Sequence, residues 1–565
     1  MIHHQVIVVG GGLAALRAAL AAQEAADVGV LSLVYPVRSH SGEAQGGINA
    51  ALANNPEGKD DNWEKHAFDT IKGSDYLADQ DAAETMAREA PGCVYEMEHW
   101  GVPFSRFDDG TIAQRPFGGA GFPRTCYAAD KTGHVLLHTM NEQCVRRGVK
   151  IYPERMVLSL AVEDGRCHGV VAMNLVTGQL ETFRAEAVIF GTGGAGRVYA
   201  RSTNAIINTG LPMALAYWAG VPLKDMEFVQ FHPTTLYGTN ILMTEGARGE
   251  GGYLINNQGE RFMARYTPKV MELAPRDIVS RSIQTEVLEG RGFEDEYVYL
   301  DLRHLGKEKI LERLPGIRAL AISFAGVDPI EKPIPIQPGQ HYTMGGIDTN
   351  VDGETKVVGF YAAGECACVS VHGANRLGGN SLLETIVFGK LAGQKVAETL
   401  KAGAIPESNP AVVERARAAL EAKIRRMVST DGGETVAQVR EEMQQTMFFK
   451  VGVFRERGDM VVAVDKVAEL QQRFHRTGLR HQGTVYNLEL MRKLELEGML
   501  ALAEVIAKGA LAREESRGSH FRRDFPERDD TKWLKHTLAT YSPDGPVLSY
   551  SPVTITRYEP QARRY

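Results

Sequence analysis

The sequence predicts an α/β fold built on a Rossmann-like, dinucleotide-binding domain whose parts are separated along the chain. Residues 10–15 (GGGLAA) lie between a β-branched run and an alanine-rich stretch, the order typical of a strand, a phosphate-binding turn and a helix. Glycine-punctuated strand patterns recur at 187–196 and 359–364. The 59 glycines among 565 residues exceed the usual share of about 7%, which indicates many tight turns or close approaches of backbone to a ligand.

The first part of the chain reads as one β-α-β unit. Residues 5–10 form a strand pattern, 13–26 a helix pattern and 28–34 a second strand. In the intervening turn we expect Gly10 to allow the bend, Gly12 to let a pyrophosphate approach the backbone, and Ala15 to permit close packing of helix on strand. Ser32 and Leu33 stand where an acidic ribose ligand would be expected, which counts against NAD.

The remaining patterns predict further domains. Residues 227–340 mix strand, turn and proline signals and read as an inserted α+β domain. After Pro406, apolar residues at helical spacing predict long helices near 413–427, from 435, and over 488–515. The final 40 or so residues look like an irregular tail. Residues 202–223 are uncharged but interrupted by glycine and proline, so we expect a buried helix with its connections and no membrane span.

Composition and charge exclude several classes of protein. Hydrophobic residues make up 44%, charged residues 24%, and the net charge is -7 with no basic block, so we expect a folded protein that binds no nucleic acid. The six cysteines form no C-x-x-C pair, which argues against a disulfide scaffold or a metal site and favours buried thiols in a reducing compartment. We also expect no targeting leader, because no basic or Arg/Ser-rich stretch opens the chain.

A series of ordered motifs resembles one known family. Over essentially its whole length, the chain is similar to the flavoprotein subunits of succinate dehydrogenase and fumarate reductase. The motifs that carry the resemblance are residues 38–40 (RSH), 44–47 (AQGG), 115–119 (RPFGG), 230–234 (QFHPT), 244–252 (TEGARGEGG), 276–277 (RD), 341–346 (HYTMGG) and 372–381 (HGANRLGGNS).

The resemblance implies an FAD cofactor attached covalently through His40. Such a bond would retain the flavin and make it a better electron acceptor, which the oxidation of an unactivated C–C bond requires. The residues expected to contact FAD are Gly10, Gly11, Gly12, Leu13, Ala14, Ala15, Ser32, Arg38, Ser39, His40, Ala44, Gln45, Gly46, Gly47, Glu365, Ser381 and Leu382.

The substrate-binding residues can be argued partly from chemistry. A small dianion needs cations and hydrogen-bond donors at both ends; Arg376 can hold a carboxylate bidentately, while His232, Thr244 and His341 can bind the rest. For proton transfer, residue chemistry alone favours His232 or His341, because histidine titrates near neutrality. The family instead implies Arg276, with a proton path through Glu245 and Arg248, and we adopt that expectation.

The resemblance also implies the activity and the assembly. Succinate and fumarate would be interconverted by hydride transfer, and electrons would pass to an iron-sulfur subunit and then, through a membrane anchor, to quinone. We expect the chain on the cytoplasmic face of a prokaryotic inner membrane, held there by its partners. The expected architecture is a discontinuous Rossmann-like FAD-binding domain (1–226 and 341–405), an inserted α+β capping domain (227–340), a helical domain (406–520) and an irregular C-terminal domain (521–565).

Two departures from the family pattern and two alternatives stay open. One departure is the short segment between Gly119 and Arg124, which bears on how the capping domain approaches. Where the family commonly has Asn-Thr-Gly-Asp-Gly with its aspartate near FAD, residues 208–212 read NTGLP, so Leu211 replaces that aspartate. A related flavoenzyme, L-aspartate oxidase, uses the same architecture without a covalent flavin and also binds a dicarboxylate. A non-catalytic FAD-binding subunit is the other alternative, which the intact set of histidines and arginines argues against.

Overall fold

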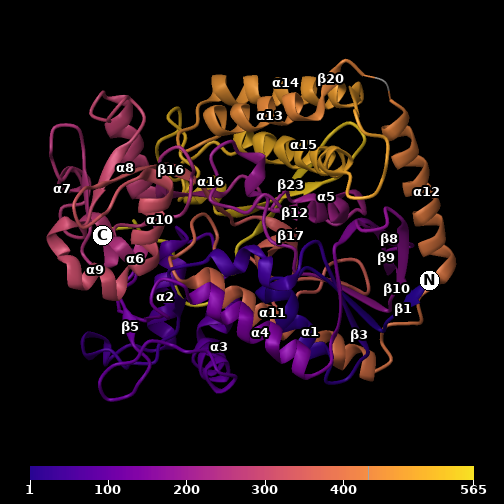
Figure 1. Cartoon of the computed structure of the whole chain (residues 1–565), viewed down its shortest axis with the longest axis horizontal. Coiled ribbons are helices and arrows are strands. Elements are labelled where there is room, and N and C mark those ends of the chain that lie inside the picture. Colours follow the sequence, from indigo (N-terminus) through magenta and orange to yellow (C-terminus); the bar gives the residue numbers. More distant parts are fainter. Residues whose placement is uncertain (431, 565) are drawn as a thin grey trace.

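The predicted nucleotide-binding sheet forms from three distant parts of the chain. The computed structural model describes residues 1–430 and 432–564. Its central sheet is entirely parallel, in the order β18-β11-β2-β3-β7, and lies near the N-terminal end of the chain in Figure 1. The discontinuous Rossmann-like fold is therefore confirmed. The five strands are β2 (Val6–Val9), β3 (Val28–Ser32), β7 (Lys150–Pro153), β11 (Ala187–Phe190) and β18 (Phe360–Ala362).

Two helices that pack against this sheet approach each other closely. They are α1 (Leu13–Ala22), which is buried on every side, and α11 (Asn380–Lys401), and they run side by side with α4 (Thr132–Arg146) in Figure 1. A Cβ atom at Gly393 would lie 2.3 Å from the carbonyl oxygen of Ala18. Glycine on α11 is what allows the two helix backbones to approach this closely.

The first 200 or so residues also form two smaller groups of strands and helices outside the central parallel sheet. A four-stranded sheet in the order β1-β10-β9-β8 is covered by α12 (Pro410–Ser429). Its strands are β1 (Ile2–His3), β8 (Arg155–Glu163), β9 (Arg166–Asn174) and β10 (Leu180–Arg184). The other group contains β4 (Ile48–Asn49), β5 (Gln114–Arg115), β6 (Thr125–Cys126), α2 (Trp63–Gly73) and α3 (Gln80–His99).

The inserted segment has its own sheet and core. Four antiparallel strands follow the order β13-β16-β15-β14, and α8 (Arg276–Leu288) packs on β13. Their apolar side chains form a separate cluster with those of the surrounding helices. The expected boundary at residue 340 falls inside β16. The elements are β13 (Val229–Leu236), β14 (Tyr253–Ile255), β15 (Val298–Asp301), β16 (Ile334–Thr343), α6 (Glu245–Gly249), α7 (Met263–Tyr266), α9 (Lys307–Arg313) and α10 (Pro315–Ala325).

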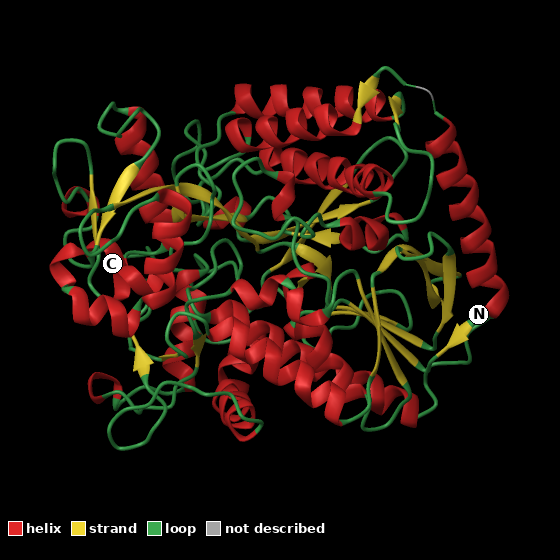
Figure 2. Cartoon of the chain, viewed as in Figure 1, coloured by secondary structure: helices red, strands yellow, loops and turns green. Residues whose placement is uncertain are grey.

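Long helices follow, close to the predicted positions. Figure 2 shows α13 (Val436–Lys450), α14 (Arg457–Phe474) and α15 (Leu488–Ala512) lying along one edge of the molecule. A capping box at Thr435 opens α13, which fixes its start. The uncharged stretch 202–223 contains α5 (Leu211–Trp218), which packs on α15. Across residues 1–430 and 432–564, no helix is long and apolar enough to cross a membrane.

The tail is more regular than the sequence led us to expect. It contains α16 (Asp530–Trp533) and an antiparallel pair of strands, β22 (Lys535–Thr540) and β23 (Val547–Pro552), which complete a five-stranded sheet. The expectation of irregular structure failed because β22 pairs with residues 223–224, some 300 positions earlier, which no local pattern reveals. The other strands are β12 (Leu223–Lys224), β17 (Gly346–Asp348) and β19 (Ala367–Cys368), and a short separate pair is β20 (Glu434–Thr435) with β21 (Thr477–Gly478).

Candidate active site

A cavity of about 630 Å³ lies where the parallel sheet meets the inserted segment. Its wall combines the carboxyl ends of β2 and β3, the loop after β3, the start of α11, and residues of β13, α6 and α8. Ligands of open parallel sheets bind at this edge. Every residue expected to contact FAD lines the cavity except Ala15, as do six of the seven residues expected to bind substrate or move protons.

The first two glycines of the turn after β2 occupy positions where a side chain would collide with neighbouring atoms. Gly10 adopts φ +126°, and a Cβ atom on it would lie 2.2 Å from the carbonyl oxygen of Gly191. At Gly11 a Cβ would lie 2.3 Å from Ser32 Oγ. Ala15 faces away from the cavity and packs against Gly191, so it has the predicted packing position and lines no part of the wall.

Polar atoms on the wall lack partners within the chain. Among the described residues, Gln45 Oε1, Thr192 Oγ1, Asn204 Oδ1 and Asn208 Nδ2 are buried without a hydrogen bond, and all four residues line the cavity. Buried polar groups of this kind are normally satisfied. A dinucleotide carries hydroxyl, phosphate and ring groups that could pair with them, so these residues fit the predicted cofactor.

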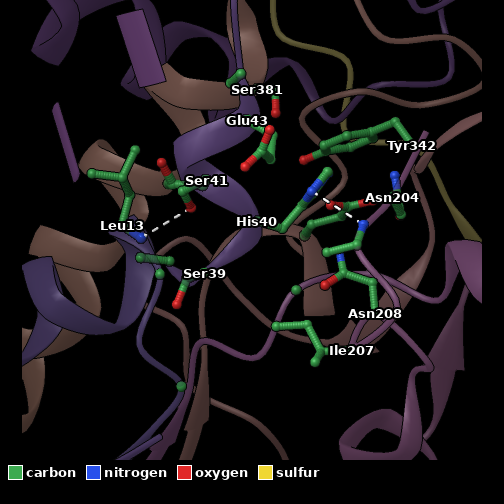
Figure 3. A pocket seen from close by; sticks show the side chains of 18 of the residues that line it. Leu13, Ser39, His40, Ser41, Glu43, Asn204, Ile207, Asn208, Tyr342 and Ser381 are labelled. Atoms are coloured by element: carbon green, nitrogen blue, oxygen red, sulfur yellow. Dashed lines mark hydrogen bonds between the residues drawn. The ribbon is translucent and has the colours of Figure 1, made fainter. Parts of the chain in front are cut away.

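His40 opens a short 3-10 turn, His40–Glu43, that forms one side of the cavity (Figure 3). Its Nδ1 accepts a hydrogen bond from the backbone amide of Ala205 at 3.3 Å. Burial, with a smaller contribution from Arg197, lowers the pKa of the imidazole from 6.5 to about 4. His40 is therefore neutral at physiological pH.

The turn that carries His40 is fixed from two sides. The Leu13 backbone amide donates to Ser41 Oγ at 3.2 Å, as Figure 3 shows, which ties the turn to α1. On the other side lies Gly133 of α4, where a Cβ would be 2.2 Å from the carbonyl oxygen of Ser41. Gly133 has no local sequence signal, because nothing in the neighbouring residues distinguishes a helix glycine that contacts another segment from one that does not.

Leu211 lines the cavity, so the family's usual carboxylate is absent from that position. Gly210, with φ +77°, is the residue before α5, and Leu211 is the first residue of the helix. Glu495 of α15 lines the same cavity. Burial raises the pKa of Glu495 to about 7, and Arg440 Nη1 lies 3.6 Å from its carboxylate.

Two buried arginines share one glutamine on the substrate side. Arg276, the first residue of α8, donates from Nη1 to Gln230 Oε1 at 3.1 Å, and Arg376 donates from Nη2 to the same oxygen at 3.0 Å. The Arg376 guanidinium also lies 4.5 Å from the ring centroid of Tyr342. Gln230 was missed as a site residue, although it opens the motif at 230–234. Gln230 lies between Arg276 and Arg376 only because the fold brings these distant residues together, so the sequence does not reveal the contact.

Glu245 links Arg276 to Arg248. Arg276 Nε donates to Glu245 Oε2 at 2.6 Å, and Arg248 Nη2 lies 3.9 Å from that oxygen. Burial alone would raise the pKa of Glu245, but the two arginines lower it below its usual value, so the carboxylate is ionised. Arg248 does not line the main cavity; it borders a second one of about 460 Å³.

Thr244 precedes this group on the wall. Its Oγ1 accepts from the backbone amide of Gly246 at 3.1 Å and caps α6. The cap sets the start of the helix, which carries Glu245 and Arg248 on one side three residues apart.

The two candidate histidines face one another with ring centroids 4.9 Å apart. The backbone amide of Thr234 donates to His232 Nδ1 at 3.2 Å, and His232 Nε2 is buried without a partner. His341 Nδ1 and Thr203 Oγ1 are 2.8 Å apart. Burial, then Arg276, lowers both pKa values well below 6.5. Neutral imidazoles this hard to protonate suit hydrogen bonding to an anion better than proton storage.

In the part of the chain that the structure describes, no three His, Cys, Asp or Glu residues are grouped so as to hold a metal ion. All six cysteines are buried. Burial raises the pKa of Cys93 to about 11, so this thiol remains protonated.

Comparisons with known proteins agree with this geometry. A family model described as an FAD binding domain matches residues 5–382, and one described as the fumarate reductase flavoprotein C-terminal region matches residues 440–565. The succinate dehydrogenase flavoprotein subunit of Rickettsia bellii is 46% identical, over 98% of this chain and 96% of its own. The fumarate reductase flavoprotein subunit of Escherichia coli is 45% identical, over 99% and 95%.

Solved structures give the same result. A mutant of the Escherichia coli quinol fumarate reductase flavoprotein matches with a TM-score of 0.95 at 44% identity, covering 100% of this chain and 98% of that one. Mycobacterium smegmatis Sdh1 matches with a TM-score of 0.86 at 35% identity, covering 99% and 95%. This FAD-binding chain thus belongs to the family of succinate dehydrogenase and fumarate reductase flavoprotein subunits.

Proposed function

We propose that this chain interconverts succinate and fumarate as the flavoprotein subunit of a succinate:quinone oxidoreductase. The observation that carries the proposal is the pair Arg276 and Arg376, buried at the FAD cavity and joined through Gln230. A cluster of buried arginines beside a redox cofactor suits a small dicarboxylate, because a dianion out of water needs compensating positive charge.

Substrate binding would use the donors that the chain leaves unpaired. Arg376 holds one carboxylate with its planar fork, while His232, Thr244 and His341 donate to the remaining oxygens. His232 Nε2 is a buried atom without a partner, so a bound carboxylate would relieve the cost of leaving it unsatisfied. Closure of the inserted segment, the proposed capping domain 227–340, would exclude water from these contacts.

Arg276 would transfer the proton. When bound, FAD supplies the two-electron acceptor for a hydride from one methylene carbon of succinate. Arg276 would first give a guanidinium proton to the ionised Glu245, which accepts from its Nε at 2.6 Å, and the neutral guanidine would then take the proton from the adjacent carbon. Arg248, beside Glu245, would lead the released proton toward the second cavity. Positive charge on neighbouring buried guanidinium groups favours the loss of a proton from this cluster. The same path run backwards protonates fumarate.

His40 would carry the flavin covalently. Its low pKa keeps a nitrogen lone pair available, as a nucleophile requires. Because Nδ1 accepts a hydrogen bond from the Ala205 amide, Nε2 is the nitrogen we expect to be attached; Nε2 would lose its proton as the bond forms, and Nδ1 would keep its lone pair and its hydrogen bond. The predicted contacts from Gly10 to Gly47 and at Glu365, Ser381 and Leu382 would hold the nucleotide. Glu365, whose pKa burial raises to about 8, would be protonated at neutral pH and able to donate a hydrogen bond.

Electrons would leave through partner subunits. The described residues hold no cluster suited to a metal ion, and single-electron transfer onward requires a second redox centre. We propose an iron-sulfur subunit as that partner, with a membrane anchor and quinone beyond it, on the cytoplasmic face of a prokaryotic inner membrane. The helical domain 406–520 and the C-terminal domain 521–565 are the proposed docking surface.

The test separates this function from its alternatives. We expect Arg276→Gln to lower succinate oxidation at least 1,000-fold, in the upper range for a proton-transfer group, while covalent flavin stays at its unaltered level. Flavin fluorescence should remain with the acid-precipitated chain and move to the supernatant in His40→Ala. Flavin released by acid from the unaltered chain would favour the aspartate oxidase alternative. Failure of succinate to bleach the flavin without oxygen would favour a non-catalytic subunit.

A further inference from the structure

The tail, residues 553–564, returns across the molecule to the residue beside Arg276. It first passes the start of α3, where Gln80 Oε1 accepts from the backbone amides of Arg557 at 2.9 Å and Tyr558 at 3.0 Å. Arg563, whose side chain is 8% exposed, then contacts Asp277, the second residue of α8. Arg563, near the end of the sequence, thus contacts the residue that directly follows Arg276, the proposed proton-transfer group.

The Arg563 contact neutralises a fully buried carboxylate. Arg563 donates from Nη2 to Asp277 Oδ2 and from Nη1 to Oδ1, the latter at 3.4 Å, and Arg281 donates to Oδ2 at 3.0 Å. Burial would raise the pKa of Asp277, but Arg563 and then Arg281 lower it. Removing Arg563 would leave this buried carboxylate with Arg281 alone, the weaker of its two cationic partners, which destabilises the charge locally. The first turn of α8 therefore depends on Arg563.

A second set of contacts leads from Arg563 to the same site. Arg563 Nη1 donates to the carbonyl oxygen of Gly73 at 3.3 Å, which also accepts from Asn375 Nδ2 at 3.1 Å. Asn375 Oδ1 in turn accepts from Gln230 Nε2 at 2.9 Å. Gln230 is the residue that joins the two site arginines. Both routes therefore reach Arg276, one through its chain neighbour and one through its hydrogen-bond partner.

Arg563 also lies where three parts of the chain meet. Its Nε is 3.9 Å from Asp75 Oδ2. Asp75 adopts a left-handed φ of +56° and accepts from the Gly518 amide and from Arg528, each at 2.8 Å. The FAD-binding part, the inserted segment and the C-terminal part are each represented in this cluster, so Arg563 lies across the seam that closure of the inserted segment must form.

We infer that Arg563 is a positioning residue for proton transfer, which fixes the first turn of α8 against the FAD-binding part and so sets the orientation of Arg276. The inference rests on the proposed function. Arg563 does not line the substrate cavity, so its effect must pass through Asp277 and Gly73. Misplacement of a reacting group by a fraction of an ångström slows a reaction without weakening ground-state binding to the same extent.

The experiment uses the assembled membrane complex, with activity normalised to covalent flavin. We expect Arg563→Ala to lower kcat for succinate at least tenfold while KM changes less than threefold. The primary isotope effect with perdeuterated succinate should rise, because the chemical step becomes slower relative to product release. Arg563→Lys should recover part of the activity, since it keeps the charge and loses the fork. Arg564→Ala, at the exposed neighbouring position, is the matched control and should behave as the unaltered complex.

Two further measurements separate the possible outcomes. Combining Arg563→Ala with Asp277→Asn should cost less than the sum of the two single changes, because Asp277→Asn removes the buried charge that Arg563→Ala leaves with one partner. The amides of α8 that donate within the helix, from Val279 onward, should lose protection against hydrogen exchange in Arg563→Ala and keep it in Arg564→Ala, whatever the activity. Unchanged protection, or a fall in kcat with an unchanged isotope effect, would overturn the inference. Succinate oxidation absent from the unaltered complex would instead refute the proposed function.

Discussion

His536 provides a pH-dependent attachment of the tail whose strength can be worked out from its surroundings. The imidazole of this β22 residue is buried between two carboxylates, with Nδ1 2.6 Å from Asp225 Oδ2 and Nε2 3.2 Å from Asp79 Oδ1. Burial by itself would lower the pKa of His536, but Asp225 and then Asp79 raise it from 6.5 to about 9. The strand is thus held by a charged histidine at neutral pH.

Because the folded pKa is raised, the stabilisation is fully present below pH 6.5 and is lost as the pH rises through 9. Linkage with these two values gives about 2.6 kcal/mol at pH 7 and about 0.4 kcal/mol at pH 9. The difference of about 2 kcal/mol corresponds to about 40-fold in the opening equilibrium of β22. It is far larger than an exposed ion pair would give.

Hydrogen exchange of the β22 amides at pH 7, 8 and 9, corrected for the intrinsic chemical rate, measures this equilibrium. We expect the protection factors of Lys535–Thr540 to fall about 40-fold across that range. His536→Gln keeps hydrogen-bonding capacity but cannot be charged, so its β22 should show low protection with little pH dependence. Equal protection at pH 7 and pH 9 in the unaltered chain would refute the assignment of a charged His536.

Two further predictions concern the site. Gly133→Ala should lower covalent flavin content, because the new Cβ would lie 2.2 Å from the Ser41 carbonyl and displace the turn that carries His40; fluorescence of the acid-precipitated chain measures the loss. Gly92→Ala, where nothing lies within 4 Å, is the control and should change nothing, so equal flavin content in both variants would contradict the prediction. Arg376→Lys should raise the dissociation constant for fumarate at least tenfold, because lysine cannot reproduce the bidentate fork. Titration of the flavin spectrum measures this constant, and an unchanged value would remove Arg376 from the binding site.

The nucleotide-binding sheet could be predicted because its evidence is local. Two of its strands, β2 and β11, are short apolar runs followed directly by glycine, at residues 6–10 and 187–191, and a parallel sheet then brings these glycine turns to one edge. The β22 strand carried no comparable signal, since its partner is a two-residue strand, Leu223–Lys224, early in the chain. The pattern of apolar residues along a segment can predict that it is a helix or a strand. It does not show which distant strand a segment will pair with.

The sequence identified polar residues that line the cavity on its candidate substrate side, but it did not indicate how they contact one another. A glutamine next to an expected histidine has no distinguishing pattern, so the bridge that Gln230 makes between two arginines appeared only in three dimensions. Ala15 is the opposite case, a residue that the motif predicts to contact the cofactor and that the structure places elsewhere. Its motif position is that of a cofactor residue, yet its side chain serves the approach of α1 to Gly191. A motif predicts which part of the fold a residue belongs to, whereas the three-dimensional structure is needed to show which atoms its side chain contacts.

The charges around the cavity explain why its arginines and its histidines suit different roles in binding a dicarboxylate. Burial and Arg276 lower the pKa of Arg376 from 12.5 to about 9, and the same two causes keep His232 and His341 uncharged. A further proton on either imidazole would add repulsion to a cluster that Glu245 alone does not balance. The neutral rings therefore donate hydrogen bonds without adding charge. The arginines keep the positive charge that an entering dianion would offset, and this arrangement favours a dicarboxylate over a neutral ligand of the same size.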